Sequence, residues 1–240
     1  MSNIQNKVFK QTVAILTDSH IHYWVTDGSL LGIIRENRLL PWDSDIDFAI
    51  WKHEYSKMEI IKLFELHGYK LLKTLPNMDC LHFIINNVQV DIGFYTYGIN
   101  DSCIKWATSP KNIFLRYYLS LVSIMFEMAI NGKNINDFKF KNNFFKYSVS
   151  ILMLVVVKLI PNRFLNSLFD KASGMYVFAG SCFSNHLMKF TQIYFLETAI
   201  VIPVEAEKHL ELTYGINWKI PNKDYKWESD TYNLKIFKDS

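Results

Sequence analysis

Three aspartates at alternating positions carry the clearest chemical signal in this sequence. Asp43, Asp45 and Asp47 stand in the run PWDSDIDFAI, whose last residues are apolar. A β-strand turns successive side chains to opposite faces, so the three carboxylates share one face while Ile46 and Phe48 share the other. Carboxylates this close repel one another, and burying them without partners is unfavourable by several kcal/mol each. We therefore expect this row to hold a cation.

The type of cation follows from the ligands. Oxygen ligands with no histidine or thiol near them in the sequence favour Mg²⁺ or Mn²⁺ over zinc. Asp91, in the run VQVDIGFY, can add a further carboxylate if its strand lies beside the strand at 45–50 in one sheet. Phosphoryl and nucleotidyl transfer require metal ions that bridge phosphate oxygens. The acidic residues thus predict a phosphate-transfer centre.

A Gly-Ser pair upstream supplies the complementary half of such a centre. Gly28 and Ser29 begin the run GSLLGIIRE, which is typical of a helix start. Glycine allows a phosphate to approach the backbone, and free amides at a helix start point toward negative oxygens. Alone, the pair indicates only a turn, and an isolated Asp-x-Asp is usually solvated. The Gly-Ser pair and the row of aspartates together are a specific signal for a phosphate-transfer centre.

The elements that must position these residues follow from hydrophobic spacing and turn signals. We expect helices at 4–20, from about residue 30, and at 53–68, and a strand at 21–27. Apolar residues of the third helix stand near helical spacing at Met58, Ile61, Leu63 or Phe64, and Leu66, and Gly68 fits its end. Residues 80–95 read as a hairpin with its turn at Asn86-Asn87, since asparagine tolerates positive φ.

After about residue 105 the pattern changes to long apolar segments at helical spacing, such as 113–130, with a polar loop at 131–143. We predict an α+β fold: a nucleotidyltransferase-like mixed β-sheet core flanked by helices, with a mostly helical C-terminal half. The expected domains are a catalytic core at 1–105 and a helical region at 106–240 packed on it.

Composition excludes global disorder, because 50% of the 240 residues are hydrophobic. The formal net charge of +3 is small, and we expect it to be spread through the chain. It is too small to favour duplex nucleic acid as a partner, although it would repel neither a phosphorylated substrate nor an anionic membrane surface.

The cysteines and the N-terminus predict a cytoplasmic protein. Cys80, Cys103 and Cys182 form no close pair, which favours a reducing compartment over a disulfide framework. The polar N-terminus shows no signal peptide. The apolar run 147–157 is shorter than the about 20 residues that span a bilayer, so we expect a core helix there, with an interfacial helix as the alternative.

A family resemblance adds to this interpretation. Gly28 to Gly32, then Arg35, then the run PWDSDID at 41–47, resemble the signature of the LicD and fukutin family of nucleotidyltransferase-fold phosphotransferases. The run IPVEAEKHLELTYGINWKIP near the C-terminus, with Tyr214-Gly215, is similar to the closing segment of the family. Asn37 and Arg38 depart from its pattern, since many members have a glycine and a small or polar residue there.

The resemblance implies an activity. Members transfer a phosphorylated alcohol, such as phosphocholine or an alditol phosphate, from a CDP-activated donor to a glycan or glycolipid hydroxyl and release CMP, in cell-surface glycan biosynthesis. By position, Asp45 and Asp47 would be metal ligands and Asp91 the third acidic residue of the site. Gly28 and Ser29 would meet the diphosphate of the donor.

Other roles follow from the chemistry, and some stay open. Asp43 or Asp91 is the expected general base. Arg35 is expected either to contact phosphate or to form a surface salt bridge, and Trp42 either to stack on the base or to pack beneath the site.

Two alternative functions remain: a nucleotidyltransferase that uses an NTP and releases pyrophosphate, and a non-catalytic binding module of the same fold. Peripheral contact with the inner face of a membrane is also open.

Overall fold

The structure of the protein is a computed structural model, which describes residues 2–72, 79–98, 101–108, 112–132, 159–173, 175, 177–223, 225 and 234–237. The chain forms two compact units. The first comprises Met1–Trp106 and Phe178–Ser240, and the second comprises Ala107–Val177. The expected division into 1–105 and 106–240 differs from this, because the last 63 residues return to the first unit.

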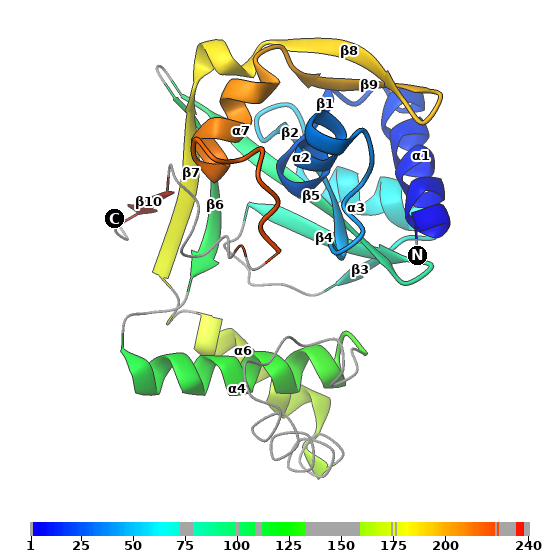
Figure 1. The fold of residues 1–240 in the computed structure, drawn as a ribbon. Coiled ribbons are helices and arrows are strands. Elements are labelled where there is room, and N and C mark those ends of the chain that lie inside the picture. Colours follow the sequence, from blue (N-terminus) through cyan, green and yellow to red (C-terminus); the bar gives the residue numbers. More distant parts are fainter. Residues whose placement is uncertain are drawn as a thin grey trace. The chain divides into compact units, whose positions relative to one another are not determined.

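A mixed sheet forms the centre of the first unit (Figure 1). Its main path runs in the order β1-β2-β5-β6-β7-β10, and β4 joins β5 and in turn pairs with β3. The strands are β1 (Tyr23–Val25), β2 (Asp45–Trp51), β3 (Lys70–Leu72), β4 (Cys80–Ile85), β5 (Val88–Tyr97), β6 (Asp101–Thr108), β7 (Val177–Ser184) and β10 (Leu234–Phe237). A separate hairpin is formed by β8 (Phe190–Phe195) and β9 (Thr198–Pro203).

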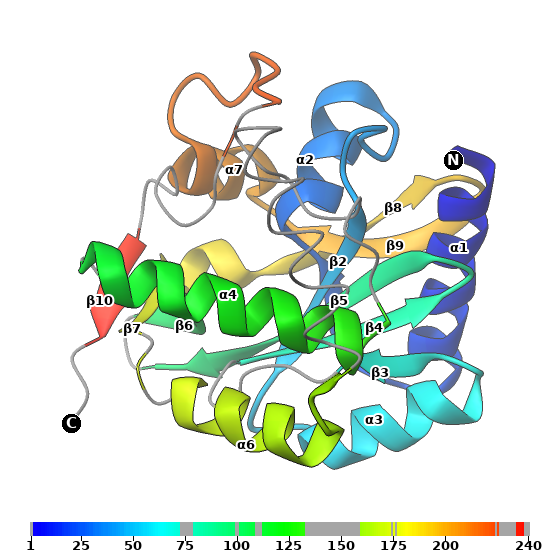
Figure 2. The same ribbon diagram turned by 90° about the horizontal axis from the view of Figure 1, so that it is seen from below.

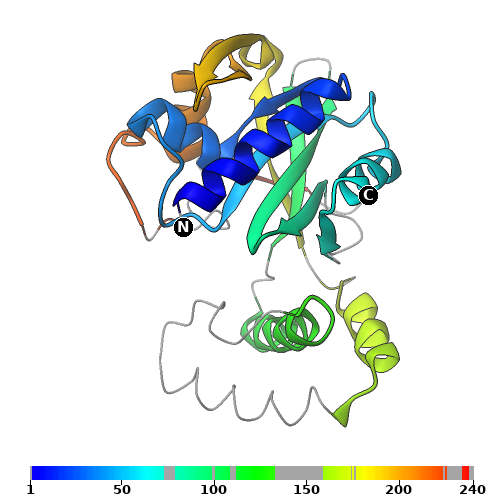
Figure 3. The same cartoon turned by 90° about the vertical axis from the view of Figure 1, so that its right-hand side faces the viewer.

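The helices of the first unit are α1 (Ser2–Asp18), α2 (Asp27–Glu36), α3 (Lys57–Leu66) and α7 (Ala206–Tyr214), with the short 3₁₀ helix η2 (Asn185–Met188) before β8. Figure 2 shows α3 beside β3, and Figure 3 shows α1 running across the sheet. The mixed sheet with flanking helices confirms the predicted fold class.

Local sequence signals account for the ends of α3. Ser56 and Glu59 form a reciprocal capping box, in which the Glu59 carboxylate accepts from the Ser56 amide at 2.7 Å and the Ser56 hydroxyl accepts from the Glu59 amide at 3.3 Å. Gly68 follows with φ +81°, a left-handed conformation that suits glycine at a helix end. The helix buries Ile60 and Phe64.

The hairpin formed by β4 and β5 confirms the predicted turn. Asn86 and Asn87 have φ of 50° and 62°, as a two-residue turn between antiparallel strands requires. β5 is also the parallel neighbour of β2, and Asp47 is paired with Asp91 in their register. The sheet therefore brings the two predicted acidic strands side by side.

The two faces of β2 serve different purposes. Ile46, Phe48 and Ile50 are completely or almost completely buried in the main core, where Phe48 stacks on Phe9 of α1 with ring centroids 5.5 Å apart. Asp45, Asp47, Ala49 and Trp51 alternate with them and share the opposite face. A second apolar cluster covers this face around Ala49, with Trp24, Tyr95 and Phe183 among its members.

The second unit contains α4 (Ile113–Ala129) and α6 (Asn162–Ser173), which pack against each other. Phe126 and Phe169 stack between them with ring centroids 3.8 Å apart. The start of α4 is capped by Asn112, whose side chain accepts from the Leu115 amide at 3.1 Å. The helix predicted at 113–130 is confirmed, whereas most of the expected loop at 131–143 and the apolar run 147–157 lie outside the described residues.

The region after residue 105 contains more strand than the sequence predicted. This part of the sequence contains β7 to β10 in addition to α4, α6 and α7, and β7 and β10 join the main sheet. Among the described residues, no helix combines the length and the apolar character that crossing a bilayer requires.

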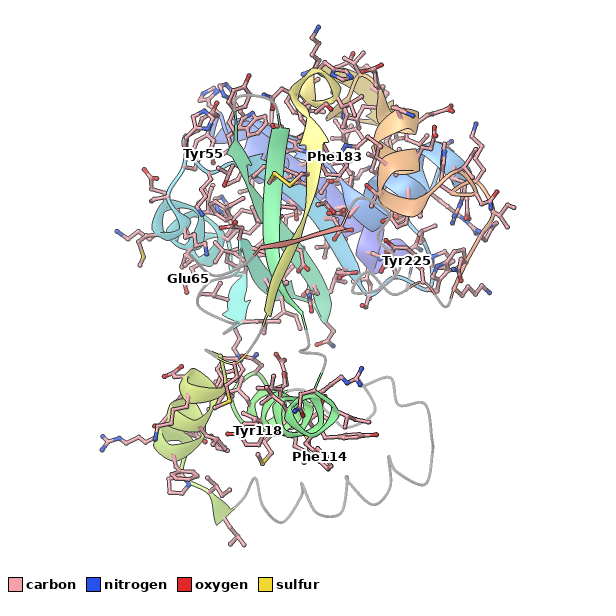
Figure 4. All side chains as sticks on the ribbon, turned by 90° about the vertical axis from the view of Figure 1, so that its left-hand side faces the viewer. Tyr55, Glu65, Phe114, Tyr118, Phe183 and Tyr225 are labelled. Atoms are coloured by element: carbon pink, nitrogen blue, oxygen red, sulfur yellow. A yellow bond between two sulfur atoms is a disulfide. The ribbon has the colours of Figure 1, made fainter. Side chains whose placement is uncertain are left out.

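A disulfide joins Cys103 of β6 to Cys182 of β7, as the yellow bond in Figure 4 shows. The expectation of unpaired cysteines was wrong, because two strands distant in sequence are brought together by the sheet. Disulfides are typical of oxidising compartments, so the cysteines no longer favour a reducing one. The cytoplasmic location stays a prediction. Cys80 is the free cysteine.

The disulfide yields a first testable prediction. Replacing Cys103 by serine should lower the free energy of unfolding by about 2–5 kcal/mol, because the bridge restricts a long loop in the unfolded chain. Urea unfolding without reductant measures the loss, and Cys80→Ala is the control that leaves the bridge intact. Three titratable thiols in the unreduced, unfolded wild-type protein would contradict the pairing.

Candidate active site

Three carboxylates converge at the start of β2. Oxygen atoms of Asp43, Asp45 and Asp47 all lie within 4.8 Å of one another. Asp45 and Asp47 belong to the strand, whereas Asp43 precedes it in a turn closed by a 3.1 Å bond from its amide to the Leu40 carbonyl. The alternation predicted for a strand therefore holds for two of the three, and the turn brings in the third.

Neighbouring strands extend this polar row. Asp91 on β5 is paired with Asp47 on one side and with His82 of β4 on the other. Paired residues of adjacent strands point to the same face of a sheet, so the three side chains form a row across β2, β5 and β4. The prediction that β5 would place Asp91 beside the acidic strand is thus confirmed in register.

The start of α2 is tied directly to Asp47. The Ser29 amide donates to Asp47 Oδ2 at 3.1 Å, and the Asp47 amide donates to Ser29 Oγ at 2.8 Å. Ser29 is 3% exposed. The reciprocal pair fixes the position of the Asp47 carboxylate relative to the helix. Whether Ser29 also contacts a diphosphate stays a prediction.

Gly28 is required by the packing of the carboxylates. A Cβ atom at this position would overlap Oδ2 of Asp43 and lie 3.3 Å from Oδ2 of Asp47. A larger residue would require the end of the Asp43 side chain to shift, and it would be in tight contact with the Asp47 carboxylate. The groups that approach this glycine in the structure are acidic side chains, and the close approach of a phosphate stays a prediction.

Asp27 is an acidic residue that sequence reasoning missed. It opens α2 with φ +45°, a conformation that non-glycine residues rarely adopt and that is often found at functional sites. Burial and the charges of Asp91 and Asp43 raise its pKa to about 6. Its place directly before the Gly-Ser pair was the available signal, because the first turn of a helix favours an acidic residue.

Burial and mutual repulsion also act on the strand aspartates. Burial, followed by the charges of Asp91 and Asp43, raises the pKa of Asp45 well above its usual value. The pKa of Asp47 is raised well above its usual value by burial and by Asp45, Asp27, Asp43 and Asp91. Negative charge concentrated in this way favours binding of a cation, which relieves the repulsion.

Asp91 is held by two side chains from the hairpin. Gln89 donates to its Oδ1 at 2.9 Å, and His82 Nδ1 lies 2.8 Å from its Oδ2. Burial lowers the pKa of His82, but the charges and hydrogen bonds of Asp91 and Cys80 together outweigh burial and raise this pKa well above the usual value. Counting back from the turn at Asn86-Asn87 places His82 opposite Asp91, so the hairpin signal could have identified it.

Two groups of side chains could hold a metal ion among the residues that the structure describes. Asp43, Asp45 and Asp47 offer only oxygen, which suits Mg²⁺ or Mn²⁺. Cys80, His82 and Asp91 form a second group, with ligand atoms within 4.8 Å of one another. Asp91 thus lies beside the acidic row but groups most closely with its hairpin neighbours.

Arg35 and Trp42 have partners elsewhere in the first unit. The Arg35 side chain is 7% exposed, and it binds Glu36 Oε1 at 2.7 Å and the Trp218 carbonyl at 3.2 Å. It therefore links α2 to the segment after α7, and its predicted phosphate contact is untested. Trp42 packs against the main core, with Lys223 Nζ 5.2 Å from its ring centroid.

Comparison with known proteins places this site in a family. The model of the LicD/FKTN/FKRP nucleotidyltransferase domain matches residues 20–153, more than half of the chain, and this range contains the acidic residues and the Gly-Ser pair. The chain belongs to the LicD/FKTN/FKRP family. Asn37, which departs from the glycine common in the family, has φ +51° at the end of α2, which explains why glycine suits this position.

The individual relatives of this LicD/FKTN/FKRP chain are either similar over a short stretch or similar at low identity over most of the chain. An uncharacterized protein, RP689, from Rickettsia prowazekii is 36% identical over 26% of the chain and 24% of its own length. The mouse ribitol-5-phosphate transferase FKTN is 22% identical over 92% of the chain. The chain spans 34% of that protein, so it covers only part of these relatives.

A solution structure of the antibiotic-resistance factor ANT(2'')-Ia is also similar to the chain, at 13% sequence identity and a TM-score of 0.37. The likeness covers 71% of this chain and 92% of the other.

The raised pKa of Asp27 predicts how stability depends on pH. The pKa of Asp27 is about 6 in the folded protein, whereas the ordinary value of 3.8 applies in the unfolded chain. Between these two pH values the folded state therefore binds more protons than the unfolded state. Stability should therefore fall as the pH rises from about 4 to about 6, and Asp27→Asn should remove on the order of 2 kcal/mol of this fall.

Urea unfolding in EDTA at about pH 4.5 and about pH 7 measures the effect. Asp18→Asn, an exposed position at the end of α1, is the matched control. An equal fall in stability for the two variants would contradict the prediction.

Proposed function

We propose that this protein is a metal-dependent phosphotransferase that moves a phosphorylated alcohol from a CDP-activated donor to a glycan or glycolipid hydroxyl and releases CMP. The convergence of Asp43, Asp45 and Asp47 at the start of β2 carries the proposal. Family membership supports it, because the relative FKTN is named a ribitol-5-phosphate transferase. That name favours an alditol phosphate over phosphocholine as the transferred group.

Asp45 and Asp47 would hold Mg²⁺ or Mn²⁺, with Asp91 as the third acidic residue. The bound ion would neutralise the diphosphate of the donor and the charge that develops on it. Ser29 keeps the Asp47 carboxylate in place through its two hydrogen bonds, and Gly28 leaves space for the Asp43 carboxylate beside it. The helix start would thereby position the ligands for the donor.

Asp43 or Asp91 would remove the proton from the attacking hydroxyl, a step that contributes about 10²-fold or more to the rate. Their surroundings differ. Both oxygens of Asp91 have partners on the hairpin, whereas the Asp43 carboxylate contacts the amide of Ser44 at 3.2 Å in the turn before β2. Separate Asn variants at the two positions would show which is the base.

The proposed function predicts that removing the charge of one metal-binding aspartate strongly lowers kcat. Asp45→Asn or Asp47→Asn should lower kcat by about 10³-fold, because the ion loses a ligand. Neither variant should be less stable by more than about 1 kcal/mol, since loss of a carboxylate relieves repulsion. Ser44→Ala is the matched control, because this exposed, uncharged residue directly precedes Asp45.

Turnover should also require the metal ion, and the products formed from different donors should identify the donor class. The test incubates the protein with a panel of CDP-linked alcohols and of NTPs, with Mg²⁺, with Mn²⁺ or with EDTA, and scores CMP against pyrophosphate. CMP release that EDTA abolishes supports the proposal. Pyrophosphate release selects the nucleotidyltransferase, and binding of a nucleotide without turnover selects the binding module. Full turnover in EDTA would exclude the metal site.

A further inference from the structure

The positive charge of the chain is concentrated in the second unit. Residues 107–177 contain nine Lys and Arg against three Asp and Glu, a net charge of +6. The rest of the chain contains 17 against 20, a net charge of −3. The even spread expected from the sequence was therefore wrong. A unit of this charge is attracted to an anionic partner.

The outer side of α4 is apolar and exposed. Phe114 is 82% exposed, Tyr117 56% and Ile113 50%. At 100° per residue these positions lie on the side of the helix opposite Leu119, Val122 and Phe126, which are buried. Figure 4 labels Phe114 and Tyr118 on α4. The helix thus has apolar side chains on both sides, although only one side packs against α6.

α6 and its flanks show the same combination. Leu165 and Phe169 are buried toward α4, whereas Phe164 is 58% exposed and stands next to the exposed Arg163. Leu159, before the helix, is 76% exposed. Arg116, on α4, is exposed among the aromatic residues. Aromatic and aliphatic side chains interspersed with arginine are typical of surfaces that enter the interface of a bilayer.

We propose that the second unit docks the protein on an anionic lipid bilayer through the exposed sides of α4 and α6. The aromatic side chains would enter the headgroup region, and the positive charge would hold the unit at the surface. In sequence, the apolar run 147–157 between Lys146 and Lys158 has the same chemistry, although it lies outside the described residues. Docking requires no turnover, so it stands or falls independently of the proposed activity.

Vesicle flotation tests the proposal with the full chain and no substrate. The protein should float with vesicles of phosphatidylcholine containing about 30% phosphatidylglycerol, and several-fold less with phosphatidylcholine alone. Binding should weaken several-fold in about 0.5 M NaCl, because salt screens the attraction. Equal binding to both vesicle types, or none to either, would overturn the proposal.

Double variants separate the contribution of the apolar side chains to vesicle binding from that of the positive charges. Phe114→Ser with Tyr117→Ser should reduce the partition coefficient at least about tenfold. Leu66→Ser with Tyr194→Ser is the control, because these side chains are 82% and 83% exposed on the first unit. Arg116→Glu with Arg163→Glu should reduce binding at least about tenfold, whereas Lys62→Glu with Lys70→Glu, an equal change in net charge, should not.

Two further measurements exclude other occupants of this surface. If the rest of the chain covered it, the Phe114 and Tyr117 variant would melt at a clearly lower temperature than its control. If a second copy covered it, sedimentation without lipid would show a dimer that the same variant dissociates. Either result overturns the proposal, whereas unchanged melting and a concentration-independent sedimentation coefficient support it.

Discussion

Repulsion among partly buried carboxylates is the constraint around which the first unit is organised. Burial and the charges of neighbouring carboxylates, Asp43 and Asp91 among them, raise the pKa values of Asp27, Asp45 and Asp47. Such a cluster persists only where the surrounding structure holds it. The hydrogen bonds between Ser29 and Asp47, the missing side chain at Gly28 and the pairing of β2 with β5 provide that support.

The two faces of β2 pack differently, and this allows the strand to carry the cluster of carboxylates. One face contributes Ile46, Phe48 and Ile50 to the main core, which stabilises the strand by burial of apolar surface. The other carries the aspartates at its start and a second apolar cluster farther along. The polar end of that face can therefore lack apolar packing without loss of the strand, because the same strand is anchored on the reverse side and at its far end.

The two units differ in charge as well as in composition. The unit with the acidic site is negative, and the helical unit is strongly positive and exposes aromatic side chains. A chain that acts on an acceptor at a lipid surface would benefit from this separation. The proposed docking would draw the basic unit to the anionic surface, and the proposed ion and donor would bind at the acidic residues of the other unit.

The sequence by itself determined the acidic strand, the Gly-Ser helix start, the Asn-Asn hairpin and the family, because these are local patterns of period, turn and motif. It did not determine which side of α3 is buried: the apolar residues Met58 and Leu66 are exposed, and Ile60 and Phe64 face the core. Only the tertiary structure decided the pairing of Cys103 with Cys182, the return of β7 and β10 to the sheet, and the contact of His82 with Asp91. Contacts between distant segments depend on how the sheet is ordered, and no local pattern of residues encodes that order.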